Sequence, residues 1–266
     1  TNFRLPQREI RRNFWNGSMM RSFLDDFMGQ RWGDLLLLHW PISIDIIKPT
    51  IPKSLELDLF EGEAWASVVG FHLSNLRIKP IRWFPWGNFH EMNLRTYVRD
   101  KEGRKGVWFH SLDSTDLFAV LGARLLYGLN YRWAEICQSK MKNSISYQSC
   151  TRSLVEKIPA ELHVELSNPT NEATIANEPI DQFLLERYRF WAERKWVGVT
   201  SSANVRHRPY DAIRIQNARY QGRLFRSHSM PEPNKSPALA HFCKGFSVRA
   251  SAPNWIYKIA GHANQR

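Results

Sequence analysis

Alternating apolar and polar positions predict strands along much of the chain. Leu55, Leu57 and Leu59 alternate with Glu56 and Asp58, which is typical of a half-buried strand. After a predicted turn at 61–63, residues 64–73 are apolar on both faces, so we expect a central strand there. The same kind of pattern predicts further short strands at 35–40, 133–139, 144–151, 161–166, 196–200, 212–218 and 246–250.

The sharpest pattern lies in two predicted strands at 89–98 and 107–113, joined by a turn. Side chains alternate along a strand, so the first of them places four polar residues on one face, Glu91, Asn93, Arg95 and Tyr97. The opposite face is apolar apart from one threonine. A row of acid, amide, base and phenol is either a solvated face or the wall of a polar pocket, and both interpretations stay open here.

Two longer helices are expected. Residues 115–127 carry apolar side chains nearly all round and predict a buried helix, which Asp113 or Ser114 caps and Gly128 ends. A polar linker at 167–178 precedes a second helix, predicted from Pro179 to about Glu193. Many closely spaced strands with two helices indicate an α+β barrel or sandwich, not alternating parallel β-α units.

Composition excludes some classes of protein. The chain has 266 residues, 43% of them hydrophobic, which is enough for a large folded core. Its net charge of +12 favours anionic ligands or partners, but the basic residues are scattered. Their densest clusters lie within 4–12 and 206–208. Without a zinc-finger spacing or an aromatic RNA-binding signature, nucleic-acid binding is disfavoured.

Three distant cysteines and the absence of an apolar leader near residue 1 predict a reduced, cytoplasmic protein. The run Leu35–Leu38 is cut short by His39 and Pro41, far below the roughly 20 residues that a membrane span needs. No membrane association is therefore expected.

Familiar catalytic and cofactor motifs are missing. The sequence has no glycine-rich nucleotide loop, no Gly-x-Ser-x-Gly elbow and no His-Glu-x-x-His helix. His90 and Glu91 are neighbours on a strand and point to opposite faces, so they cannot hold one metal together. We expect no metal and no cofactor, and interpret His39, His72 and His110 as core or pocket-wall residues.

The polar face of the strand at 89–98 carries the main site hypothesis. If that face is interior, Glu91 and Arg95 must pair or meet a ligand, because an unpaired buried charge is costly. Arg124, within the apolar helix, faces the same choice: it reaches a carboxylate such as Asp113 or Glu91, or extends to the surface.

Several segments resemble one known family. They are residues 36–41, 55–65, 91–98, 106–113, 124–131 and 183–188. These are similar to the YqjF-like bacterial domain of unknown function, in the acetoacetate-decarboxylase-like superfamily. The resemblance implies a largely antiparallel, cone-shaped β-barrel with helices around it and a central cavity. It covers about 32–250 as a single domain, with a lead-in at 1–31 that packs on it and a tail at 251–266.

The resemblance fails at the catalytic lysines of the true decarboxylase, which forms an imine with its substrate. The matching segment here is 128–132, and Tyr131 and Arg132 stand at the lysine positions. A phenol cannot form an imine, so the parent mechanism is disfavoured. The resemblance also aligns Glu91 with an active-site glutamate and puts Trp40 where the family carries a cation.

Three hypotheses follow. In the first, a barrel cavity binds a small molecule such as an organic acid, and its ligand-binding residues are Glu91, Asn93, Arg95, His110, Arg124 and Tyr131. In the second, the protein is not an enzyme and its basic surface holds an anionic partner. The third is a lyase that uses another lysine. The sequence does not decide whether the protein is an enzyme or a homo-oligomer.

Overall fold

The computed structural model describes residues 17–80, 87–166, 175–194 and 199–256, and these form a mixed α+β structure that is mostly sheet. The strands are β1 (Met28–Ile42), β2 (Glu56–Leu57), β3 (Ala64–Ile78), β4 (Phe89–Arg99), β5 (Lys105–Ser114), β6 (Tyr131–Met141), β7 (Ser144–Thr151), β8 (Pro159–Glu165), β9 (Arg189–Arg194), β10 (Val199–Arg206), β11 (Ala212–Arg214), β12 (Asn217–Gly222) and β13 (Leu239–Ala250). The helices are α2 (Gly17–Asp25), α3 (Ile44–Ile47), α4 (Leu117–Tyr127) and α5 (Pro179–Leu185), with short 3₁₀ turns η1 (Lys48–Thr50) and η2 (Arg226–His228).

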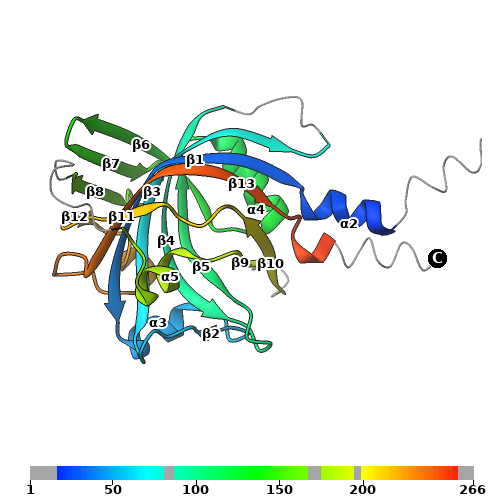
Figure 1. Ribbon diagram of the computed structural model, residues 1–266, viewed down its shortest axis with the longest axis horizontal. Helices are drawn as coiled ribbons and strands as arrows, with labels where there is room; N and C mark the ends of the chain where they lie inside the picture. The colour runs from blue at the N-terminus through cyan, green and yellow to red at the C-terminus, as the bar shows by residue number, and fades with distance from the viewer. Residues whose placement is uncertain (1–16, 81–86, 167–174, 195–198, 257–266) are drawn as a thin grey trace, which may run out of the picture.

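Seven strands close into a ring. Starting from β4, the pairing runs through β3, β1, β13, β10, β9 and β5, and β5 pairs with β4 again (Figure 1). The expectation of a largely antiparallel sheet is only partly right, because β5 pairs in parallel with both β9 and β6. The connection from β5 to β6 passes through helix α4, and such a crossover joins parallel strands.

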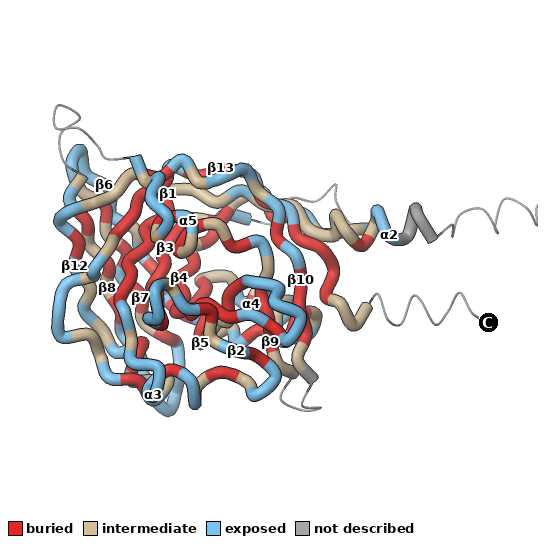
Figure 2. Tube along the Cα trace, turned by 60° about the horizontal axis from the view of Figure 1, so that its bottom comes forward, coloured by how far each residue is buried: buried red, intermediate tan, exposed pale blue. Residues whose placement is uncertain are grey.

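The ring has an apolar interior and a second core outside it. The interior core takes side chains from every strand of the ring, for example Leu37, Val69 and Tyr97. The outer core lies between the other face of β1, β3 and β4 and the strands β6, β7, β8 and β12. Strands β3 and β4 are therefore buried along most of their length, because they have a core on each side (Figure 2).

Helix α4 departs from its prediction. Asp116 caps it by accepting from the Ala119 N–H at 2.8 Å, and Gly128 ends it with a φ of 74°, as a C-terminal glycine should. Of its eleven residues only Val120 and Tyr127 are buried, whereas Phe118 and Leu125 are 70% and 73% exposed. The expectation of an all-round buried helix is therefore wrong, since only one side of α4 meets the strands.

Other boundaries also differ. Strand β1 runs from Met28 to Ile42, well beyond the predicted 35–40. The predicted turn at 61–63 is present, because Phe60 and Glu63 exchange backbone hydrogen bonds across it, but β2 pairs with β4 and not with β3. Helix α5 ends at Leu185 because the chain turns to enter β9 at Arg189. Within the described ranges no helix is long and apolar enough to cross a membrane.

Candidate functional site

The polar face of β4 points into the ring. Phe89 and Tyr97, on the same face as the three polar residues between them, belong to the interior core, while Met92 belongs to the outer core. Glu91, Asn93 and Arg95 are therefore interior residues, and each is at most 7% exposed. Burial of an acid, an amide and a base in one row requires that each find a partner.

Glu91 finds two partners. Its Oε2 accepts from the Tyr131 hydroxyl at 2.6 Å, and its Oε1 accepts from Asn93 Nδ2 at 3.2 Å. Burial raises the pKa of Glu91 to about 7, because desolvation outweighs these hydrogen bonds and the attraction of Arg95. Burial and the neighbouring carboxylate raise the pKa of Tyr131 well above its ordinary value, so the phenol stays a hydrogen-bond donor. The structure thus brings Glu91, Asn93 and Tyr131 together.

Arg95 and Asn93 are left with unused polar atoms. The Nε and Nη2 atoms of Arg95 and the Oδ1 atom of Asn93 are buried and have no hydrogen-bond partner. Arg95 lies directly across from Ser67 on β3 and from Phe109 on β5. Buried donors of a charged group without a partner among the described residues are rare in folded proteins, which marks Arg95 as a candidate binding residue.

A chain of hydrogen bonds lies further along the same interior. Ser67 Oγ lies 2.6 Å from His39 Nδ1, His39 Nε2 lies 3.0 Å from His241 Nδ1, and His241 Nε2 lies 2.9 Å from Asp181 Oδ1. The hydroxyl oxygen of Tyr97 lies 2.6 Å from Ser67 Oγ and 3.0 Å from the Leu184 carbonyl oxygen. His39 was expected as a wall residue and Tyr97 as part of the polar face, whereas Ser67, His241 and Asp181 were not predicted, because they are far apart along the chain.

We call this chain of hydrogen bonds, from Ser67 through His39 and His241 to Asp181, the relay. Which atom donates in each bond follows from the charge of Asp181. Burial alone would raise the pKa of Asp181, but hydrogen bonds from Arg214, the Glu178 N–H and His241 lower it, so Asp181 is ionised and only accepts. Burial lowers the pKa of both histidines, which are therefore neutral at pH 7. His241 then donates to Asp181, His39 donates to His241, and Ser67 donates to His39.

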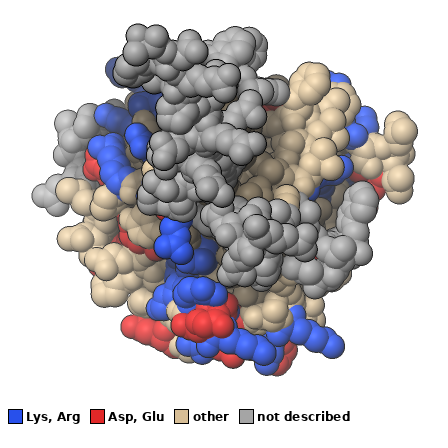
Figure 3. Space-filling view, turned by 90° about the vertical axis from the view of Figure 1, so that its right-hand side faces the viewer, with Lys and Arg blue, Asp and Glu red and all other residues tan. Residues whose placement is uncertain are grey.

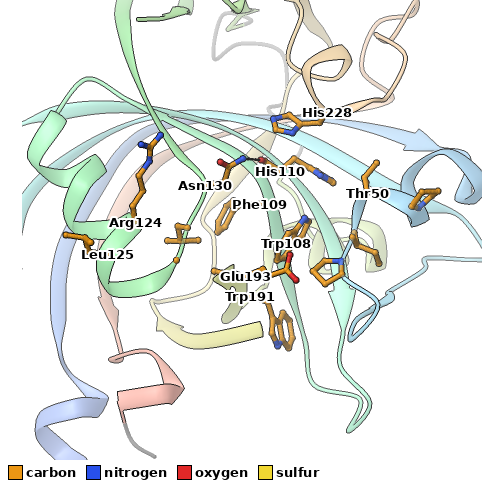
Figure 4. Close-up of a pocket in the computed structure, with 16 residues that line it drawn as sticks. Thr50, Trp108, Phe109, His110, Arg124, Leu125, Asn130, Trp191, Glu193 and His228 are labelled. Atoms are coloured by element: carbon orange, nitrogen blue, oxygen red, sulfur yellow. Dashed lines mark hydrogen bonds between the residues drawn. The ribbon is translucent and has the colours of Figure 1, made fainter. Parts of the chain in front are cut away.

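His110 and Arg124 lie elsewhere. They line a groove of about 720 Å³ beside β5 and β9, and Figure 4 shows Arg124 and Leu125 reaching it from α4 with Thr50 on the other side. A neighbouring hollow of about 680 Å³ shares His110 and His228. Burial and the nearby His228 lower the pKa of His110 to about 3, so its imidazole is neutral. Neither hollow is lined by Glu91, Asn93, Arg95 or Tyr131.

Arg124 does not reach a carboxylate. It is exposed, and its Nε donates to the Tyr131 carbonyl at 2.7 Å. Arg132 pairs with Asp113 instead, through Nε to Oδ1 at 2.6 Å and Nη2 to Oδ2 at 3.0 Å. The salt bridge is buried on the acid's side, so Arg132 is fixed as a structural residue at the base of β6.

The charged surface is mixed. The cluster at 4–12 lies outside the described residues, while in the other cluster Arg206 and Arg208 donate to the backbone carbonyls of Asp25 and Gly245. On the face drawn in Figure 3, Lys and Arg atoms lie beside Asp and Glu atoms along the lower edge. Among the described residues no group of three or more His, Cys, Asp or Glu side chains could hold a metal ion.

Comparison with solved structures shows the fold. An acetoacetate-decarboxylase-like enzyme from Sphingomonas wittichii RW1 superposes with a TM-score of 0.58 at 12% identity, covering 87% of this chain and 94% of that one. Acetoacetate decarboxylase from Legionella pneumophila gives 0.55 at 11% identity, covering 84% and 86%. The enduracididine biosynthesis enzyme MppR complexed with pyruvate gives 0.53 at 11%, covering 85% and 88%. The structure thus has an acetoacetate-decarboxylase-like fold.

Sequence comparison gives the family. The uncharacterized protein YqjF of Bacillus subtilis (strain 168) is 33% identical over 221 residues, which are 82% of this chain and 87% of that protein. A family model described as an uncharacterized conserved protein, DUF2071, matches residues 29–247. These spans include every strand of the ring except the first residue of β1 and the last residues of β13. The chain belongs to the DUF2071 family.

Proposed function

We propose that the strand ring acts as a barrel whose central cavity binds a small organic anion. The unpartnered Nε and Nη2 atoms of buried Arg95 carry this proposal. A guanidinium presents such donors in a fork that matches a carboxylate, which would satisfy both at once. The free Oδ1 of Asn93, one step along the same face, could accept from a hydroxyl of the ligand.

Glu91 would serve as the proton-exchanging group of this site. A carboxyl with a pKa of about 7 is present in both protonation states near neutral pH, which suits a general acid or base. Its bonds to Tyr131 and Asn93 fix its orientation beside Arg95. An anion bound by Arg95 would therefore lie near a group that can take or give a proton.

The proposal does not include imine chemistry. None of the described lysines is buried, and all of them except the half-buried Lys79 are exposed. The family resemblance aligns Tyr131 with one of the lysine positions of the decarboxylase, and its hydroxyl donates to Glu91. The structurally similar MppR is complexed with pyruvate, which supports a small carboxylate as the ligand class, but this chain would hold it by hydrogen bonds and charge.

Calorimetric titration tests the proposal, with pyruvate and other short-chain carboxylic acids against their neutral amides. Wild type should bind at least one acid in preference to its amide. Arg95→Met should lower the affinity for that acid about 10- to 100-fold, which is the usual contribution of a hydrogen bond to a charged group. The matched control is Arg99→Met, because Arg99 is exposed and pairs with Glu56 at the end of the same strand.

Equal affinity in Arg95→Met and wild type would contradict the proposal, as would the absence of binding by every acid tested. Borohydride treatment with pyruvate, followed by mass spectrometry, tests the imine route separately. We expect no covalent adduct, and an adduct would show that a lysine takes part.

A further inference from the structure

The groove at His110 lies where one edge of β5 is shared between two strands. That edge pairs with β9 at Val107–Trp108 and with β6 at Leu112–Ser114, so residues 109–111 pair with neither. The gap opens a hollow of about 720 Å³, within the usual size range of small-molecule sites. Its lining does not include Glu91 or Arg95, so it is separate from the proposed interior site.

Aromatic side chains form the wall of this groove. Trp108 on β5 and Trp191 on β9 are directly in register, and Phe109 and Leu129 add further apolar surface. Figure 4 shows both tryptophans on the same part of the wall, below Phe109. Flat apolar walls favour a planar aromatic ring, which can stack on or pack edge-on against indole.

Polar groups lie at separate places around that wall. Arg124 uses its Nε on the Tyr131 carbonyl but is exposed, so its terminal nitrogens can bind a carboxylate. Glu193 is the one acid of the lining, and Figure 4 shows it beside the tryptophans, apart from Arg124. It can accept from a hydroxyl or amino group of a ligand.

A histidine pair completes the lining. The His110 and His228 ring centroids are 5.9 Å apart, and His110 is 4% exposed. His110 Nε2 has no hydrogen-bond partner. A buried imidazole nitrogen without a partner is a second sign, besides the hollow itself, that the groove is completed by a molecule outside the chain.

We propose that this groove is a second ligand site, which binds an aromatic carboxylate that carries a hydroxyl or amino group on its ring. The ring lies on Trp108 and Trp191, and the carboxylate pairs with Arg124. The ring substituent donates to Glu193. The site lies beside residues 109–111 of β5, which pair with neither β9 nor β6. Neither Arg124 nor Glu193 is part of the proposed interior site.

Calorimetric titration with 4-aminobenzoate tests this proposal, with benzoate and cyclohexanecarboxylate as comparison probes. Wild type should bind 4-aminobenzoate most tightly and the non-aromatic acid most weakly. Arg124→Met should weaken 4-aminobenzoate at least tenfold, and since Arg124 is exposed the variant should fold normally. Glu193→Gln should lower the affinity for 4-aminobenzoate and leave the affinity for benzoate unchanged.

Two controls separate this site from the interior one. Arg95→Met should keep its affinity for 4-aminobenzoate, and Arg124→Met should keep the wild-type affinity for any short-chain acid bound inside the ring. The proposal is overturned if 4-aminobenzoate binds Arg124→Met as tightly as wild type, if it does not bind wild type, or if Arg95→Met abolishes its binding.

Discussion

Strand β4 sends polar side chains to two regions of the ring interior that differ in one respect. Around Tyr97, the polar atoms of Ser67, His39, His241 and Asp181 all have hydrogen-bond partners within the chain. Around Arg95, two guanidinium nitrogens and the Asn93 carbonyl oxygen have none. The two regions are equally buried, so burial alone does not distinguish them.

The difference in hydrogen bonding suggests different roles for the two regions. A fully satisfied buried network stabilises one arrangement of strands, because any other arrangement leaves polar groups unpaired. A buried polar group without a hydrogen-bond partner destabilises the folded protein by on the order of 1–3 kcal/mol. We expect such a group to persist where a ligand supplies the missing partner. We therefore propose a structural role for the relay at Tyr97 and a ligand-binding role for the Arg95 region.

The largest effect is expected at the end of the relay. Asp181→Ala should lower the free energy of unfolding by about 4 kcal/mol, because it strips His241 and Arg214 of their acceptor and α5 of its N-terminal bond. Denaturant unfolding measures this. Glu178→Ala is the control, since that carboxylate also pairs with Arg214 but is 63% exposed, and its loss should cost less than about 1 kcal/mol. If the two variants lost similar amounts of unfolding free energy, the relay would not have the structural role proposed for it.

Glu91 should leave a signature in the pH dependence of stability. Below pH 4.5 the carboxyl is protonated in both states, while between 4.5 and about 7 the unfolded chain releases the proton and the folded protein keeps it. The free energy of unfolding should therefore fall through this window, by on the order of 3 kcal/mol, and level off above it. Glu91→Gln should lose this contribution, as unfolding at a series of pH values would show. An unchanged pH profile in the variant would mean that the pKa of Glu91 is ordinary.

Ser67→Ala probes the middle of the relay. It leaves the buried His39 Nδ1 with only the long contact to the Tyr97 hydroxyl at 3.4 Å, so we expect a loss of about 2 kcal/mol. Ser54→Ala removes a hydroxyl from an exposed hydrogen bond with Thr200 and should change stability by less than about 0.5 kcal/mol. If thermal unfolding gives both variants the same melting temperature, the relay does not contribute to stability.

The smallest change in stability is expected at Arg95, where the effect on binding is largest. Arg95→Met replaces a buried cation without hydrogen-bond partners by an apolar side chain of similar length, and its free energy of unfolding should stay within about 1 kcal/mol of wild type. Denaturant unfolding without added ligand checks this. A loss of 3 kcal/mol or more would place Arg95 in the structural network and end the contrast between the two regions.

Sequence periodicity was sufficient for part of this picture. Alternation along 89–98 placed Glu91, Asn93 and Arg95 on one face, and they do share the interior of the ring. The segment resemblance predicted the family and the acetoacetate-decarboxylase-like fold, and both are confirmed. The ligand-binding role of the six predicted residues stays a prediction.

The other features depend on contacts between residues that are distant in the sequence, which the local pattern of apolar and polar residues does not predict. His39 and His241 are 202 residues apart, and only the pairing of β1 with β13 brings them together. The apolar composition of α4 gave no indication of which side meets the strands, so its exposed Phe118 and Leu125 were assigned to the core. Sequence reasoning groups His110 and Arg124 with Glu91, although His110 on β5 and Arg124 on α4 line a separate groove.

The central claim is that an organic anion completes the Arg95 region, and a high-resolution crystal structure of the protein soaked with its preferred short-chain acid tests it most directly. The account predicts a carboxylate within about 3 Å of Arg95 Nε and Nη2, with the ligand also in reach of Asn93 Oδ1 and Glu91. A structure at saturating acid in which Arg95 binds only water or groups of the protein would contradict it.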